Sequence, residues 1–134
     1  MKAEQRTVIE HMMEKGERAL KSAGEHIKQG DHDFASSKAY YAVFHFMQAA
    51  LATKELTFSK HSAVIAEFNK NFIRSGIFPK DFSKNIERLF KQRQIGDYDY
   101  SPVIDKEAAG KDLAIAKMIC DKVEEYLRKE ILPK

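Results

Sequence analysis

The chain has 134 residues, a formal net charge of +3 and a single cysteine, Cys120. Its length predicts one domain over residues 1–134, large enough to bury a stable hydrophobic core without the help of disulfides or bound metal ions. One cysteine excludes an intrachain disulfide, and neither a signal peptide nor a run of about 20 apolar residues is visible, so we expect a cytoplasmic protein that does not enter a membrane.

Two long helices are predicted in the first part of the chain. The first covers about residues 4–29 and carries one apolar stripe at helical spacing. The stripe consists of Val8, Met12, Ala19, Ala23 and Ile27. Gly30 predicts the end of this helix, and Asp31 is a candidate N-cap for a second helix at about residues 32–54. The second helix is apolar almost all round, which predicts a place at the centre of a bundle or, in addition, in a subunit interface.

The middle of the chain predicts a third and a fourth helix. Ser59 is a candidate cap for the third helix, and Gly76 and Pro79 break the chain after it. A fourth helix is expected over about residues 81–95. Gly96 follows it directly, where a left-handed glycine commonly ends a helix.

The last helix is expected to begin near Asp105, after the Ser101-Pro102 break, and to close at Pro133. Its apolar seam alternates steps of three and four residues, as helices in bundles do. The seam consists of Ala109, Leu113, Ala116, Cys120, Val123 and Leu127. Nothing alternates with a period of two residues. The sequence therefore predicts an all-α, up-and-down bundle of four long helices plus a shorter fifth helix.

Arg93 departs from the pattern of its own helix. It continues, at helical steps, the apolar stripe that contains Phe82, Ile86 and Leu89. A buried arginine needs a partner, because a stranded charge is costly. One interpretation is structural, with Arg93 paired to Asp97 or Asp99 so that the pair locks the turn. The other is functional, because a planar guanidinium in a cleft suits a phosphate group.

The residues after Arg93, DYDY, add two tyrosines to this corner. If the segment is extended, Tyr98 and Tyr100 point to one side and the two aspartates to the other. Such tyrosines can stack on a base or carry a modification on the hydroxyl. We expect Tyr100 to pack against the bundle. For Tyr98, both interpretations, packing and a functional role, stay open.

Basic residues are concentrated just before this corner. Seven lysines and arginines but only two acids lie between Lys70 and Arg93. This excess either attracts a phosphate-rich partner, with Lys91 as a candidate contact beside Arg93, or forms a solvated face.

The five histidines show no spacing typical of a metal site, and no motif for a cofactor or phosphate loop is present. His45 lies in the apolar second helix and is expected to be a hydrogen-bonded core residue. His61 opens the third helix and is expected to be exposed, with a role near a cleft left open. Cys120 is expected to pack in the seam of the last helix.

Three stretches together resemble the HEPN family, the higher eukaryotes and prokaryotes nucleotide-binding domain. They are ASSKAYYAVFHFMQAAL at residues 35–51, SKHSAVIAEF at residues 59–68 and RQIGDYDY at residues 93–100. The resemblance spans about residues 17–126. It is greatest to the small single-domain prokaryotic branch whose members often pair with a minimal nucleotidyltransferase.

This resemblance implies a helical bundle that forms a homodimer, with its site in the dimer cleft. Many members of the family are metal-independent ribonucleases in which four to six residues separate an arginine from a histidine that follows it. Arg93 matches the arginine, but Tyr98, Asp99 and Tyr100 stand where the histidine would be. Histidine titrates near neutral pH, whereas the pKa of tyrosine is about 10 and that of aspartate about 4. The usual ribonuclease mechanism therefore does not transfer intact.

Our leading hypothesis is a dimeric module that binds nucleotide or RNA through Arg93, Asp97, Tyr98 and Lys91, and that pairs with a nucleotidyltransferase as toxin–antitoxin proteins do. In such pairs the partner can modify a tyrosine near this motif, which makes Tyr98 and Tyr100 candidates. Two alternatives stay open. One is a divergent metal-independent ribonuclease that uses Arg93 with Tyr98, Asp97 or a remote His61. The other is an interaction scaffold in which Arg93 is purely structural.

Overall fold

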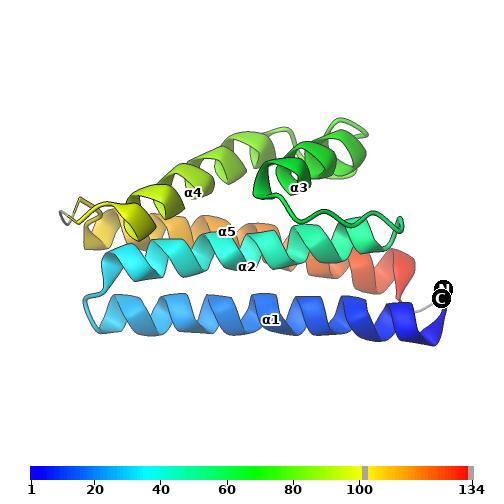
Figure 1. The fold of residues 1–134 in the computed structure, drawn as a ribbon, viewed down its shortest axis with the longest axis horizontal. Coiled ribbons are helices and arrows are strands. Elements are labelled where there is room, and N and C mark those ends of the chain that lie inside the picture. The colour runs from blue at the N-terminus through cyan, green and yellow to red at the C-terminus, as the bar shows by residue number, and fades with distance from the viewer. Residues whose placement is uncertain (101–102, 133–134) are drawn as a thin grey trace.

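The computed structural model describes residues 1–100 and 103–132, and within them it contains helices and no strand (Figure 1). The helices are α1 (Ala3–Lys28), α2 (His32–Ala52), α3 (His61–Phe68), α4 (Asp81–Tyr98) and α5 (Lys106–Tyr126). Two short π-helical segments continue them, η1 (Asn69–Ile73) after α3 and η2 (Leu127–Ile131) after α5. The predicted all-α bundle of four long helices and a shorter one is confirmed. The expected breaks at Ser101-Pro102 and Pro133 lie outside the described residues.

The apolar helix α2 lies at the centre of the bundle. It packs against α1, α3, α4 and α5, and α4 crosses it obliquely while α1 runs beside it along its length (Figure 1). The sequence predicted this position, because a helix without a polar face must be covered on every side. A further role of α2 in a subunit interface remains a prediction.

The stripe predicted for α1 is wrong by one residue near its start. Val8 is half-exposed, whereas Ile9 and Met13 are buried. The buried face continues through Gly16, where an added Cβ would lie 2.6 Å from the ring of Phe46. A pattern that counts only large apolar residues misses a face that includes a glycine.

Three of the helix boundaries predicted at Gly30, Asp31, Ser59 and Asp105 are right, and one is wrong. Gly30 has a φ of 82°, as expected after α1, and the Asp105 carboxylate accepts a hydrogen bond of 2.8 Å from the backbone N–H of Ala108 at the start of α5. Asp31 holds the predicted N-cap position of α2, whereas the cap predicted at Ser59 is wrong. The Asp31 side chain makes no capping bond, and Lys60 occupies the N-cap position of α3.

Gly96 does not end the fourth helix, which continues to Tyr98. It is buried inside the last turns of α4, where a Cβ would lie 2.5 Å from the backbone oxygen of Asp33. The glycine therefore allows the backbone of α4 to touch the start of α2. Asp97 and Tyr98 are helical and Asp99 is the extended C-cap, so the extended segment on which an alternation of DYDY depended is not formed at Asp97 and Tyr98.

A membrane span requires a helix that is both long and apolar. Among the described residues, none of the helices combines the two properties.

Candidate functional site

Arg93 lies on the face of α4 that packs against α2, and its side chain is 12 % exposed. Its Nη2 donates a hydrogen bond of 3.0 Å to the hydroxyl of Tyr41 on α2. Four aromatic rings surround the guanidinium, with their centroids 5.5–5.9 Å from Cζ. They belong to Tyr40, Tyr41, Phe90 and Tyr98. Rings at this distance attract a cation through their faces, so the charge is held without full hydration.

Asp97 is the carboxylate that balances this charge. Its Oδ2 lies 3.2 Å from Nε of Arg93, one helical turn away. The N–H of that buried Nε is not aligned on any acceptor in the described structure, so the pair is an ion pair without a second good hydrogen bond. Burial lowers the pKa of Arg93, but the hydrogen bond to Tyr41 and the negative charge of Asp97 raise it by more, and the guanidinium stays charged.

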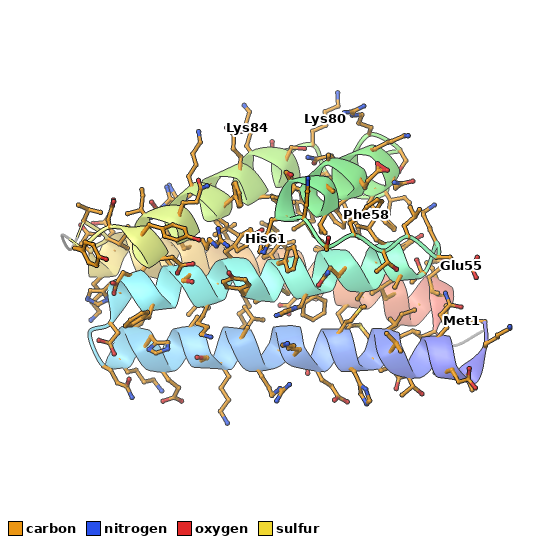
Figure 2. All side chains as sticks on the ribbon, viewed as in Figure 1. Met1, Glu55, Phe58, His61, Lys80 and Lys84 are labelled. Atoms are coloured by element: carbon orange, nitrogen blue, oxygen red, sulfur yellow. The ribbon has the colours of Figure 1, made fainter. Side chains whose placement is uncertain are left out.

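The structure brings His61 into the same aromatic cluster. Its Nδ1 and the hydroxyl of Tyr40 are 2.7 Å apart and share a hydrogen bond, and its ring stacks on Phe44 at 4.1 Å. Figure 2 shows His61 between α3 and α2. Burial, and then the charge of Arg93, lower the pKa of His61, while burial raises the pKa of Tyr40 far above its usual range. The expectation that His61 is exposed was wrong, because stacking on α2 half-buries it.

The remaining candidate residues lie around Arg93 at different distances from it. Tyr98 contacts the guanidinium through its ring but is 68 % exposed, and Tyr100 is fully exposed, so the expected packing of Tyr100 is wrong. Lys91 lies on the outer face of α4, where its Nζ pairs with Glu87 at 3.1 Å. Asp99 makes no ion pair with Arg93 in the described structure.

His45 is half-buried on α2 and follows Tyr41 by one helical turn. Burial and then the charge of Lys15 lower the pKa of His45 to about 4, so it is neutral at neutral pH. Across the described residues, no three histidine, cysteine, aspartate or glutamate side chains come together as metal ligands would. Cys120 is buried in the seam of α5, as predicted, and burial raises the pKa of its thiol.

A buried carboxylate close to the site along α4 and α5 was not among the residues predicted from the sequence. Asp112 of α5 is completely buried and accepts hydrogen bonds from Ser36 at 2.8 Å, Arg88 at 2.8 Å and Gln92 at 3.0 Å. These bonds join α2, α4 and α5 just before Arg93 along α4. A signal existed, because Asp112 stands three residues after Ala109 and four before Ala116, on the apolar seam itself.

The sequence of these helices matches a known protein family. The family model described as "HEPN domain" matches residues 9–126. The chain belongs to the HEPN domain family. The resemblance expected from the sequence is thereby confirmed over most of the chain.

Individual relatives of this HEPN protein match it over most of its length. It is 33 % identical over 119 residues to "Putative toxin MJ0142" of Methanocaldococcus jannaschii, and the match covers 89 % of this chain and 81 % of the relative. It is 31 % identical over 124 residues to a "UPF0332 protein" of Thermotoga maritima, with 92 % and 94 % covered. The HEPN assignment therefore does not depend on one short segment.

A solved structure shares the fold of this HEPN protein. The crystal structure of TT1696 from Thermus thermophilus matches it with a TM-score of 0.76 over 87 % of this chain and 96 % of that chain. The sequence identity is 20 %, so the match concerns the fold alone.

Proposed function

We propose that this HEPN protein is a toxin-like module that binds RNA or a nucleotide through a phosphate group at Arg93. The observation that carries the proposal is a charged guanidinium that four aromatic rings frame and whose Nε–H has no aligned acceptor among the described residues, although Asp97 forms an ion pair with it. A phosphate group accepts paired hydrogen bonds from such a planar fork, and the nearby tyrosine rings can stack on a base. The name of the relative from M. jannaschii supports the toxin-like part.

The proposal includes a homodimer and a nucleotidyltransferase partner, as the family resemblance implies. Tyr98 and Tyr100 are the candidate modified residues; both are exposed, and the ring of Tyr98 contacts Arg93. Light scattering tests the dimer, and the presence or absence of a small nucleotidyltransferase gene next to this one tests the pairing.

Replacement of Arg93 by alanine is expected to weaken RNA binding by roughly 10- to 100-fold. A hydrogen bond to a charged group contributes about 1.5–3 kcal/mol, which corresponds to that loss of affinity. Fluorescence anisotropy with a 12-nucleotide, 2′-O-methyl oligouridylate measures it, because the methyl group prevents cleavage through the 2′-hydroxyl.

Arg74→Ala is the matched control, because Arg74 is an exposed arginine outside the site. Arg93→Lys separates charge from shape, since lysine keeps the charge but loses the fork. If Arg93→Ala lowers the melting temperature and leaves RNA affinity at the wild-type value, Arg93 is structural and the proposal is wrong.

A second candidate function is metal-independent RNA cleavage, and the position of His61 favours it. With Nδ1–H of His61 donating to the Tyr40 hydroxyl, Nε2 is free to take the proton from a 2′-hydroxyl. The 2′-oxygen then attacks the phosphorus, the bond to the 5′-oxygen breaks, and that oxygen takes a proton from water. Arg93 would stabilise the charge that develops on the phosphate. His61 would thus replace, from another helix, the histidine that is missing after Arg93.

This candidate predicts that His61→Ala and Arg93→Ala each abolish cleavage of total RNA in the presence of EDTA, while His11→Ala, on an exposed part of α1, does not. The activity should fall at acidic pH. A general base must be neutral, and the pKa of His61 lies below its usual value of about 6.5, so activity should be complete at pH 7 and decline as the pH falls through that lowered pKa. Cleavage that survives His61→Ala contradicts this mechanism, and no cleavage by the wild type leaves binding as the function.

A further inference from the structure

A second basic surface lies on the other side of Tyr41, between α1 and α2. Lys15, Arg18 and Lys38 line an open cavity of about 500 Å³ there, together with Tyr41 and His45. We call this cavity the basic groove. Among the described residues, no aspartate or glutamate lines it. Its volume is in the range of sites that hold a small molecule or one unit of a polymer.

Among the described residues, the three cations of the basic groove have no ion-pair partner. Within residues 1–100 and 103–132, no carboxylate oxygen lies within 4.0 Å of Lys15, Arg18 or Lys38. Some basic residues on the helices are paired with an acid one turn away, as Lys91 is with Glu87, whereas these three converge on one cavity without such a pair among the described residues. Like charges that converge without a partner repel one another, and an anionic ligand relieves that repulsion.

The effect of these charges is visible at His45. After burial, the charge of Lys15 is the largest cause that lowers the pKa of His45, and Lys38 and Arg18 act in the same direction. All three cations therefore act on the space that His45 faces. The acids Glu14 and Glu17 line a separate hollow that shares Arg18 with the groove and does not include Tyr41.

The basic groove and the Arg93 site meet at one residue. Tyr41 borders the groove, and its hydroxyl accepts the hydrogen bond from Nη2 of Arg93. A ligand that passes over Tyr41 can thus reach the guanidinium and the three groove cations in succession. A single phosphate is too small to use all four charges, whereas successive phosphates of a nucleic acid strand fit such a row.

We propose that the basic groove binds the sugar–phosphate backbone of single-stranded RNA that continues from the phosphate held at Arg93; this rests on the proposed function. A single strand suits the geometry, because its unpaired nucleotides can enter a small cavity and lie against a tyrosine ring. The groove supplies affinity along the strand without reading its sequence.

The experiment compares two triple variants with the same change of charge. The groove variant carries Lys15→Gln, Arg18→Gln and Lys38→Gln. The control variant carries Lys106→Gln, Lys111→Gln and Lys117→Gln, which alter exposed lysines of α5 that do not line the groove. Binding of the 12-nucleotide 2′-O-methyl oligouridylate is measured at several salt concentrations, with melting temperatures to confirm that both variants are folded.

The groove variant is expected to lose about 100-fold in affinity at about 0.1 M salt. Each phosphate contact to a single strand contributes about 0.7 to the slope of log affinity against log salt, so three lost contacts flatten the slope by about 2. The control variant should keep the wild-type slope within about 0.7. Equal losses in the two variants, or a groove variant that binds like the wild type, overturn the groove proposal.

The same measurements separate the two proposals. A groove variant that binds normally while Arg93→Ala weakens binding removes the groove and leaves the proposed function standing. Loss of affinity in the groove variant with none in Arg93→Ala supports the groove and removes the Arg93 site. A wild-type protein that does not bind the oligonucleotide overturns both.

Discussion

Asp112→Ala is expected to lower the free energy of unfolding by about 3 kcal/mol, in a urea titration monitored by circular dichroism. Removing one partner of a buried ion pair costs about 3–5 kcal/mol. The lower end applies because Arg88 is 34 % exposed and can turn to water, whereas Asp112 is completely buried. The rest of the loss comes from the buried hydroxyl of Ser36 and the amide of Gln92, which lose their acceptor.

Asp121→Ala is the matched control, because Asp121 is an exposed aspartate on the same helix. A surface change of this kind alters stability by about 0.5 kcal/mol or less. Asp112→Asn should fall between the two, since asparagine keeps an acceptor for Ser36 but not the charge opposite Arg88. If Asp112→Ala were as stable as Asp121→Ala, the buried network would not hold α4 and α5 to α2.

Gly96→Ala is expected to destabilise the protein by about 1–3 kcal/mol, because overpacking a tight contact costs that much. The added Cβ would lie 2.5 Å from the backbone oxygen of Asp33, and a backbone atom cannot swing aside as the end of a side chain can. The last turns of α4 must therefore move away from α2. Arg93 lies one turn before Gly96, so RNA affinity should decrease as well.

Gly110→Ala is the matched control, because the same substitution is expected to raise the stability of the protein at this position. Gly110 is inside α5, and nothing among the described residues lies within 4 Å of the Cβ it would gain. Alanine is favoured over glycine in a helix by about 1 kcal/mol, so this variant should be more stable than the wild type. Chemical denaturation of the two variants side by side decides the matter, and equal stabilities would contradict the close contact at Gly96.

The fold could be predicted because its determinants are periodic. The absence of a polar face on α2 indicated its central position, and the glycine at residue 30 marked the end of α1. Gly96 could not be interpreted in the same way. A glycine after an apolar stripe is equally compatible with a helix end and with a close contact between two helices. The contact of Gly96 with the backbone of Asp33 distinguishes the two possibilities, and this contact depends on how α4 packs against α2.

In the candidate site, only contacts between residues that are close in the sequence could be predicted. The pairing of Arg93 with Asp97 follows from a spacing of one helical turn. The contacts of Arg93 with Tyr41, 52 residues away, and of Tyr40 with His61 depend on how α2, α3 and α4 pack. The same is true of the basic groove, whose cations come from two helices and do not stand out in the sequence. The basic run of residues 70–93 identified a region rich in charge, but not the cations that line a cavity.

The central position of α2 also affects the order in which the molecule can fold. During synthesis α2 emerges long before α5, and the hydroxyl of Ser36 then has no Asp112 to bond, across 76 residues of sequence. An apolar helix with one side still uncovered is prone to aggregate. The apolar surface of the α1–α2 hairpin therefore stays incompletely covered until the last helix leaves the ribosome, and it must be shielded or transiently collapsed during that time. A chain that stops short of α5 should be recovered in inclusion bodies and not as a smaller soluble domain.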